Sequence, residues 1–515
     1  MEFYIKDLEY HESDLKRIQA EVRDLSQRKQ AFRIFHGSTN STRPAHHERV
    51  VDISCLRRIL RIDPKKETAL VEPNVPMDKL VEATLEVGLV PPVVTEFPGI
   101  TVGGGFAGSA GESSSFKYGY FSQTVSRVEM ILADGVIVRA SAHEREDLFH
   151  GAAEAAGTLG VITLLELRLI PAKTYVKLTY YPISSMGDAV DSIMGETKNS
   201  MNDYVDGILY SRNSGVIMAG ILTNEKPPSV SVQRFSGPWD PWFYMHAQER
   251  IQNRLEETGG EAMVDYIPLR DYLFRYDRGA FWVGRECFKY FGFVPFNRLT
   301  RWFLDDFLHA RMLYRALHGT SSSVDFMIQD LSLPFANAER FMDYAAGNFE
   351  VWPLWLCPLR EMRSPAFHPN SSTREDKPQP MLNIGLWGRV SKGPIAFVQQ
   401  NRDLERHLSQ LGGRKALYSH TYYTEQEFWD LYGKPWYEKL REKYRATTLP
   451  SIYDKVTVNP SEIYAERAWS QWLLSLWPLP GIAGIAAAIR SGDYVYHRQP
   501  IWKRLWERGI RDKLD

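Results

Sequence analysis

The sequence predicts an α+β protein with two domains and a short C-terminal appendage. Apolar runs of strand length are interspersed with helical stretches, but they do not form the succession of equal βα units that a Rossmann fold requires. The stretch 127–140 consists of two apolar runs around Asp134-Gly135, which is a strong β-hairpin signal. Residues 468–489 contain no charged side chain and precede a basic tail, so they form a separate C-terminal unit.

Composition excludes several classes of protein. The 515 residues carry 62 Lys and Arg against 63 Asp and Glu, so the net charge of −1 argues against binding nucleic acid by bulk phosphate attraction. Three cysteines, far apart in the sequence, exclude a disulfide scaffold and a zinc knuckle. We expect no metal site. The N-terminus lacks the apolar core of a signal peptide.

The first 175 residues read as a compact series of short elements. We expect a helix within 1–30, strands at 31–37, 50–53, 59–62 and 69–71, and a helix at 77–85 with Gly88 beyond its C-terminus. Pro91-Pro92-Val93-Val94 is expected to start another strand. Residues 98–119 are rich in Gly and Ser and look too irregular for a helix or a strand. A helix at 145–156 and a buried strand at 161–170 follow.

Residues 176–457 form the second predicted domain. A hairpin is expected at 204–211 and 215–223, with further strands at 352–360, 383–390 and 415–424. Long helices are expected near 240–256, 298–318, 335–347, 395–411 and 425–443. Strands separated by long helices indicate an antiparallel sheet covered by helices.

The appendage, 458–515, has the composition of a membrane attachment. Tryptophans precede Pro478 and Pro480, an Ala/Gly/Ile stretch follows them, and a basic tail follows Arg490. Tryptophan and cationic flanks are typical of an interfacial anchor. We therefore expect peripheral or monotopic membrane association through residues 468–513; a buried helical hairpin is the alternative.

Three small-residue segments indicate a phosphate-bearing cofactor: 35–43, 98–119 and 147–163. Gly103–Gly108 matches G-x-G-x-x-G literally, with Glu129 downstream, but no buried strand precedes it, so a Rossmann NAD site is not expected. Loops of small residues let backbone amides approach a diphosphate closely without any lysine. Val161-Ile162 offers an apolar backbone edge for a planar heterocycle.

These segments resemble the FAD-binding domain of the vanillyl-alcohol oxidase and p-cresol methylhydroxylase (PCMH) superfamily. Residues 101–119 (TVGGGFAGSAGESSSFKYG), 132–135 (LADG), 157–160 (GTLG), 266–272 (YIPLRDY), 352–358 (WPLWLCP) and 367–369 (FHP) resemble its delta(24)-sterol reductase branch. The likeness runs from about residue 30 to 457. It implies a two-domain PCMH-type fold in which an antiparallel-sheet cap domain follows the FAD-binding domain.

The resemblance implies which residues hold FAD. They are Phe35, His36, Gly37, Ser38, Thr39, Asn40, Thr101, Val102, Gly103, Gly104, Gly105, Gly108, Ser109, Glu112, Ser113, Gly160, Val161 and Ile162. Many members of the superfamily bond the flavin to a histidine immediately before the loop serine. Gly37 holds that place here and His36 lies one position earlier, so we expect non-covalent FAD.

The implied activity is NADPH-dependent reduction of a C=C bond in the side chain of a sterol. Reduced flavin would give hydride from N5, and an acid would protonate the other carbon. Spacing does not single out that acid; the candidates are Lys117 and Tyr118 beside the flavin loop, and His420 and Tyr422, which share a face if 415–424 is a strand. Cys357 is expected in the core.

Two other functions remain open from the sequence. An FAD-linked oxidase could pass electrons from an alcohol, lactone or terpenoid to oxygen, because the flavin domain does not decide between the two reactions. A flavin-binding membrane protein without turnover is the second alternative. The branch implies the cytosolic face of the endoplasmic reticulum, with the cytoplasm as the other possibility.

Overall fold

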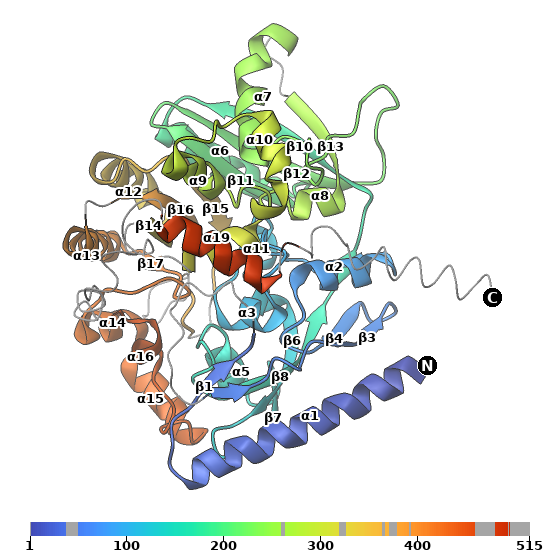
Figure 1. Cartoon of the computed structure of the whole chain (residues 1–515), viewed down its shortest axis with the longest axis vertical. Coiled ribbons are helices and arrows are strands. Elements are labelled where there is room, and N and C mark those ends of the chain that lie inside the picture. Colours follow the sequence, from blue (N-terminus) through green and yellow to red (C-terminus); the bar gives the residue numbers. More distant parts are fainter. Residues whose placement is uncertain are drawn as a thin grey trace.

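The computed structural model describes residues 2–37, 50–258, 263–318, 326–362, 366–369, 379–390, 393–458, 479–492 and 494. In this part of the protein two mixed layers of sheet and helix lie one above the other, with the small sheet and α1 at the bottom of Figure 1 and the large sheet above. The expected mixed fold with antiparallel sheets is confirmed.

The small sheet has the order β3-β4-β8-β6-β7, and all its neighbours are antiparallel. Helix α1 packs beneath it, with Ile18 and Val22 fully buried. The hairpin predicted around Asp134-Gly135 is confirmed, because Ile131 pairs with Ile137. The strands are β3 (Ile59–Asp63), β4 (Thr68–Val71), β6 (Val125–Ile131), β7 (Ile137–Ser141) and β8 (Val161–Arg168).

Two short strand pairs flank this sheet. They are the parallel pair β1 (Arg33–Phe35) and β2 (Val50–Asp52), and the antiparallel pair β5 (Leu89–Val90) and β9 (Ile170–Pro171).

The large sheet has the order β13-β10-β12-β11-β15-β16-β14-β17 and is antiparallel wherever its strands pair. The predicted hairpin of 204–211 and 215–223 forms its centre. Its strands are β10 (Tyr175–Ile183), β11 (Tyr204–Ser211), β12 (Ser214–Thr223), β13 (Met263–Pro268), β14 (Phe326–Pro334), β15 (Leu354–Leu359), β16 (Met381–Arg389) and β17 (Arg414–Lys415).

Helices cover both layers. The described ones are α1 (Glu2–Gln27), α2 (Met77–Leu85), α3 (Val102–Ala107), α4 (Ser115–Tyr118), α5 (Glu146–Ala152), α6 (Met186–Lys198), α7 (Phe243–Thr258), α8 (Leu269–Leu273), α9 (Val283–Phe291), α10 (Arg298–Phe303), α11 (Ala310–His318), α12 (Phe335–Asn348), α13 (Pro394–Gln410), α14 (Glu425–Tyr432), α15 (Lys434–Lys443), α16 (Ile452–Val456) and α19 (Leu479–Ser491), with 3-10 turns at Phe121–Thr124 and Asp305–Phe307.

The two faces of the large sheet have different roles because side chains alternate along each strand. One face packs an apolar core under α6, α12 and α13, as Val205 of β11 and Leu356 of β15 illustrate. The other face, which we call the inner face, joins the core that includes the small sheet. It carries Asp206, Trp355, Cys357, Asp330, Ser332, Asn383 and Trp387.

Several sequence-based expectations are wrong. Pro91 and Pro92 lack the amide hydrogens of a ladder, and residues 91–94 are a buried loop instead of a strand. Within the stretch judged too irregular for a helix, Thr101 accepts a hydrogen bond from the Gly104 amide and begins α3.

The predicted strand 415–424 is also wrong: it ends at Lys415, after which Ser419 donates back to the Ala416 carbonyl in a turn. Two expected long helices are each divided. Gly433, at φ +69°, separates α14 from α15, and a 3-10 turn separates α10 from α11.

The described part of the C-terminal appendage is a helix on the surface. In α19, Ala488 is buried, while Ile482, Ile485 and Ile489 are exposed. A Cβ at Gly481 would lie 2.6 Å from the Tyr290 ring, so this glycine lets α19 approach the end of α9 closely. Within the described residues, no helix combines the length and the apolar character needed to cross a membrane.

Candidate active site

The serine-rich loop before α4 lies directly against the inner face of the large sheet. Val205 of β11 donates its amide to the Ser113 carbonyl over 2.7 Å, and the Cys357 thiol donates to the Glu112 carbonyl over 3.2 Å. Cys357 is buried, as the sequence predicted. The serine-rich loop is therefore joined to β11 and β15 by two hydrogen bonds at this interface.

Glu112 is buried in this interface and surrounded by donors. Its Oε2 accepts from the Ser113 hydroxyl at 2.7 Å, and its Oε1 accepts from the Ser114 amide at 3.0 Å and from the Ser114 hydroxyl. Burial raises the pKa of Glu112, while the Ser113 and Ser114 hydroxyls and the nearby Arg275 guanidinium oppose that shift.

Arg275 supplies the cation of the interface. Its Nη2 donates to Asp206 Oδ2 over 2.9 Å and to Ser113 Oγ over 3.3 Å, with both charged side chains fully buried. The guanidinium also lies 4.1 Å from the Tyr272 ring centroid, a cation–π contact. Asp206 Oδ2 accepts further bonds from the Tyr276 hydroxyl and the Trp355 indole.

Glu96 is a second buried carboxyl of the same interface. It sits in the loop that follows β5, and its Oε1 has no hydrogen-bond partner among the described residues. Burial, and then the charge of Glu112, raise the pKa of Glu96 well above its ordinary value. Sequence analysis missed this residue, because a single glutamate between apolar residues carries no motif.

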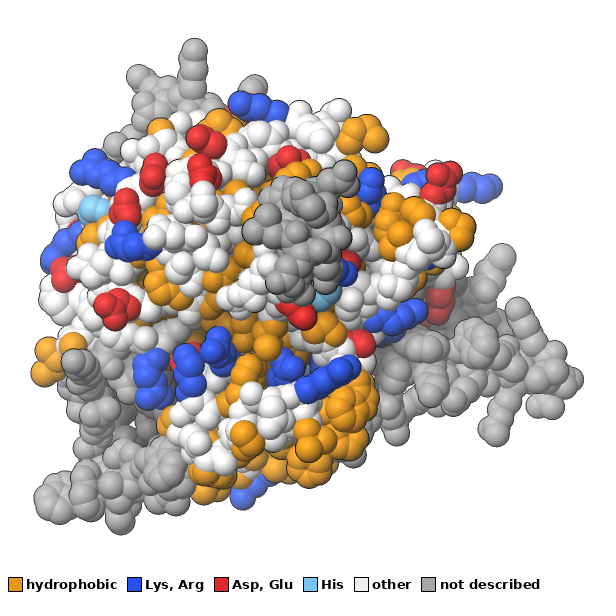
Figure 2. Space-filling model, turned by 90° about the horizontal axis from the view of Figure 1, so that it is seen from above, with side chains coloured by type: hydrophobic (Ala, Val, Ile, Leu, Met, Phe, Trp, Pro, Cys, Tyr) orange, Lys and Arg blue, Asp and Glu red, His pale blue; other side chains and the backbone are white. Residues whose placement is uncertain are grey.

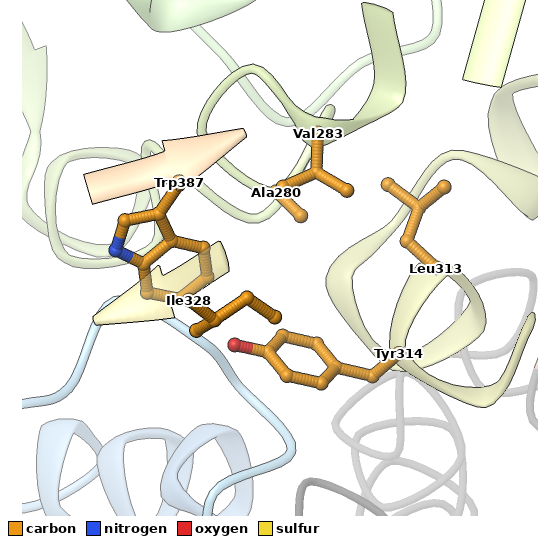
Figure 3. Close-up of a pocket in the computed structure, with 6 residues that line it drawn as sticks. All are labelled: Ala280, Val283, Leu313, Tyr314, Ile328 and Trp387. Carbon is orange, nitrogen blue, oxygen red and sulfur yellow. The ribbon is translucent and has the colours of Figure 1, made fainter. Parts of the chain in front are cut away.

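A small apolar pocket lies next to Glu96. Figure 3 shows the Tyr314 ring and the Trp387 indole on either side of Ile328, with Ala280, Val283 and Leu313 completing the wall. Phe97, the neighbour of Glu96, packs edge-on against both aromatic rings, with centroids 5.5 Å from Tyr314 and 5.9 Å from Trp387. The loop that carries Glu96 therefore reaches the pocket wall.

A polar network crosses the inner face beside this pocket. Asp330 accepts from the Tyr418 hydroxyl at 2.5 Å and from the Asn383 amide at 2.9 Å, and Ser332 donates to the Asn383 carbonyl oxygen. Burial raises the pKa of Asp330, and the Tyr418 and Asn383 donors oppose that shift. Both oxygens of this carboxyl are thus engaged by protein donors.

A further buried network links Glu154, in the loop after α5, to residues 366–369. Ser122 Oγ lies 3.0 Å from His368 Nε2, His368 Nδ1 contacts Glu154 Oε1, and Ser109 donates to Glu154 Oε2. Burial raises the pKa of Glu154 well above normal and lowers that of His368 well below normal. Burial thus favours the uncharged form of both groups, so the network ties Ser109 to the FHP segment without a buried ion pair.

The glycines of α3 are explained largely by close packing. A Cβ at Gly103 would lie 2.6 Å from the Pro73 side chain, and one at Gly105 would lie 2.9 Å from the Phe121 ring. The amides of Val102, Gly103, Gly104 and Gly105 all donate within the protein. These four amides are therefore occupied, whereas a diphosphate nest requires free ones.

The other predicted cofactor residues are spread around this region. Phe35 is exposed at the end of β1, His36 and Gly37 follow it, and Ser38, Thr39 and Asn40 lie outside the described residues. Val161 and Ile162 pair with β6 on one side, while pairing with β4 begins only at Leu165. Gly160, at φ +145°, brings β8 close to the Ile131 carbonyl. Contact of Gly108 and the rest with FAD stays a prediction.

The four catalytic candidates stay predictions. Lys117 donates to Asp203 Oδ1 over 2.7 Å, and Tyr118 beside it is half-buried. Tyr422 is buried, and its amide donates to Glu405. The argument that His420 and Tyr422 share a strand face is wrong, because neither lies on a strand. No described group of three His, Cys, Asp or Glu side chains is arranged to hold a metal ion.

Comparison with known proteins identifies the family. Residues 13–141 match the FAD binding domain family. The chain is 31% identical to the Delta(24)-sterol reductase of Homo sapiens over 412 residues, which cover 78% of this chain and 76% of the relative. It is 30% identical to the Arabidopsis thaliana Delta(24)-sterol reductase over 443 residues, covering 80% and 77%.

The chain belongs to the delta(24)-sterol reductase family. Cytokinin dehydrogenase 9 of Oryza sativa subsp. japonica is also similar, at 26% identity, but over only 141 residues, or 27% of each protein. The match to the sterol reductases extends well beyond the FAD-binding region, into the part that carries the inner face and the pocket.

The described residues fit an FAD-dependent member of this family. The serine-rich loop within the FAD-binding region meets the inner face, and the two buried oxygens Thr95 Oγ1 and Glu96 Oε1 have no partner among the described residues. Unpaired buried polar atoms are costly, and a bound cofactor or substrate can satisfy them. Flavin, when bound, supplies a hydride donor; the protein supplies the apolar pocket, the buried cation and the buried carboxyls.

Proposed function

We propose that this protein reduces an isolated C=C bond in the side chain of a sterol, with FAD as its redox group and NADPH as its electron donor. The observation that carries the proposal is the likeness to Delta(24)-sterol reductases over about four-fifths of the sequence. The buried Glu96 carboxyl, whose neighbour Phe97 packs against Tyr314 and Trp387, supports it, because protonation of a hydrocarbon alkene needs an acid in apolar surroundings.

The two-domain organisation belongs to the same proposal. Residues 1–175 would hold FAD, 176–457 would form the cap over the substrate, and 458–515 would be an appendage. The non-covalent attachment of FAD rests on Gly37 standing where a flavin-linked histidine is expected. Acid precipitation should release the flavin into the supernatant; flavin fluorescence that stays with the denatured protein would contradict this.

A two-step stopped-flow experiment tests the reaction. NADPH should reduce the bound flavin without oxygen, and a sterol with a C24 double bond should then reoxidise it rapidly. A sterol with the same nucleus and a saturated side chain is the matched control and should leave the flavin reduced. Reoxidation by oxygen alone, together with failure of NADPH to reduce the flavin, would overturn the proposal.

Residues 468–513 are proposed to attach the protein to the cytosolic face of the endoplasmic reticulum membrane. The described part of this segment supports attachment, since Ile482, Ile485 and Ile489 of α19 point outward while Ala488 is buried. Phe293, just after α9, is 70% exposed. Figure 2 shows hydrophobic side chains gathered on one face with a row of Lys and Arg beside them, the combination that anionic lipid attracts.

Vesicle flotation tests the attachment. The full-length protein should float with anionic vesicles, and a variant ending at Val456 should not. Replacing Ile482 and Ile485 with Asp should weaken flotation without removing the segment. Full flotation of the truncated variant would contradict the proposal, and aggregation of that variant would indicate that α19 is a packed part of the body.

A further inference from the structure

The loop that carries Glu96 is held rigidly at both sides of this residue. The Ser114 hydroxyl shares its proton between Glu112 Oε1 and the Pro92 carbonyl, which lies 2.7 Å from Oγ, and Arg311 Nη2 donates to the Pro98 carbonyl over 3.1 Å. Every residue from 91 to 99 is buried. A polar side chain fixed in this way, without a partner for Oε1 among the described residues, is not explained by the packing of the loop.

Glu96 lies within electrostatic reach of the pocket. Tyr314, which lines the pocket, and Cys357 on β15 both lie near enough to Glu96 for an ionised Glu96 to raise their pKa values, although burial is the largest influence on both groups. Phe97 connects the loop to the pocket wall through its contacts with Tyr314 and Trp387. The ionisable groups that face Glu96 from the surrounding elements are Glu112, Asp206, Arg275, Tyr314, Cys357 and Tyr418.

The two carboxyls of this interface differ in the hydrogen-bond donors that surround them. Glu112 has three donors from Ser113 and Ser114, which stabilise its carboxylate. Glu96 has no such donor at Oε1, and burial together with the charge of Glu112 raises its pKa well above the ordinary value, which favours its protonated form. Two neighbouring acids whose surroundings separate their proton affinities are the usual arrangement for an acid that must remain protonated at neutral pH.

We propose that Glu96 is the catalytic acid that protonates the substrate alkene. The inference rests on the proposed function. The carboxyl O–H bond breaks, its proton forms a new C–H bond with one alkene carbon, and the hydride from reduced flavin forms the second C–H bond. The alkene is reduced, the flavin is oxidised, and Glu96 is left as a carboxylate that recovers a proton from solvent.

Tyr314 of the pocket and Asp330 of the inner face are less suited to this step. Burial raises the pKa of Tyr314 well above its ordinary value, so its hydroxyl is a much weaker acid than a carboxyl. Asp330 already accepts hydrogen bonds at both of its oxygens. Glu96 combines a pKa raised well above its ordinary value by burial with an oxygen left open among the described residues.

The decisive experiment separates the two half-reactions in the flavin-loaded Glu96→Gln variant. Flavin reduction by NADPH should proceed as in the wild type, whereas reoxidation by the alkene should slow about 10²- to 10⁴-fold, the usual share of a general acid. In the wild type this second rate should fall as pH rises and Glu96 loses its proton. In the Gln variant it should not depend on pH in that range.

A spectroscopic readout tests the protonation state independently of turnover. The infrared spectrum of the wild type should contain the carbonyl band of a protonated carboxyl that Glu96→Gln removes. The matched control is Glu82→Gln, which removes a half-buried carboxyl of α2 that is paired with Arg270 and also has a raised pKa. This control should leave both half-reactions unchanged.

Three results would count against the inference. An unchanged rate of alkene reduction in Glu96→Gln would overturn it. A large loss of that rate in Tyr314→Phe, with no loss in Glu96→Gln, would also overturn it. Absence of the infrared band from the wild type would also overturn it. If the wild type itself is reduced by NADPH but never reoxidised by the alkene, the proposed function fails, which is a distinct outcome.

Discussion

Glu112 and Glu96 lie on two different loops at the same buried interface, and they differ in the number of hydrogen-bond donors around their carboxyl groups. The serine-rich loop surrounds Glu112 with hydroxyl and amide donors and lies against β11 and β15. The loop after β5 is fixed by its backbone carbonyls and leaves Glu96 Oε1 without a partner among the described residues. The first arrangement joins the two layers, and the second keeps a polar group available to a ligand.

Burial alone therefore does not determine the pKa of a carboxyl. Both side chains are at least nine-tenths buried, and burial is the largest influence on both pKa values. The hydroxyl and amide donors around Glu112 oppose the effect of burial on its pKa, whereas the pKa of Glu96 is raised well above its ordinary value. Substitutions at Arg275, at Glu112 and Glu96, and at the exposed Arg212 test this comparison.

The largest effect is expected for Arg275→Met. This change leaves the buried Asp206 without its cation, and breaking a buried pair in this way costs about 3–5 kcal/mol of unfolding free energy. Urea unfolding followed by circular dichroism measures it. Arg275→Lys, which keeps the charge, should recover part of the loss. If Arg275→Met lowered the unfolding free energy no more than removal of an exposed ion pair does, the interface would not depend on this cation.

Glu112→Gln should replace one of the two accepting oxygens with an NH2 donor and remove one negative charge. We expect a loss of about 1.5–3 kcal/mol, the range for hydrogen bonds to a charged group. Removing the charge should also lower the pKa of Glu96, so alkene reduction should decline at a lower pH than in the wild type. The control is Glu166→Gln, which breaks a pair with the exposed Arg127. It should change neither the unfolding free energy nor the pH at which alkene reduction declines.

Glu96→Leu should stabilise the protein while abolishing alkene reduction. Replacing an unpartnered buried polar group with an apolar one of similar size should gain about 1–2 kcal/mol. The raised pKa means that the folded state binds a proton that the unfolded state releases above its own pKa, so wild-type stability falls as pH rises. The gain should therefore be larger at neutral pH than in mild acid; a gain independent of pH would contradict a protonated Glu96.

The smallest effect is expected for Arg212→Ala. Its ion pair with Asp343 is 2.5 Å long, but the two side chains are 47% and 57% exposed. Water and salt screen such a pair, so its loss should change the unfolding free energy by about 0–1 kcal/mol. Thermal unfolding of this variant and of Arg275→Met under the same conditions compares the exposed Arg212–Asp343 pair with the buried Arg275–Asp206 pair. A loss as large as that of Arg275→Met would remove the contrast between buried and exposed pairs.

Local signals predicted much of the fold. The Asp134-Gly135 turn, the helix from Met77 to Leu85 and the hairpin of β11 and β12 are found where the sequence indicates, because each depends on neighbouring residues. The strand expected at 415–424 fails because hydrogen bonds from Lys415 and Ser419 to nearby groups replace a ladder. The helix α3 was also missed, because its glycines are explained by close contacts with Pro73 and Phe121, which are distant in the sequence.

The sequence by itself determined the flavin-binding character of residues 13–141, the family and the uneven C-terminal segment, since these depend on residue order and composition. Only the tertiary structure decided which polar residues meet. Glu96, Glu112, Asp206 and Arg275 come from four separate segments, and burial in one interface couples their charges. Proton affinity depends on that shared environment, which no stretch of sequence contains.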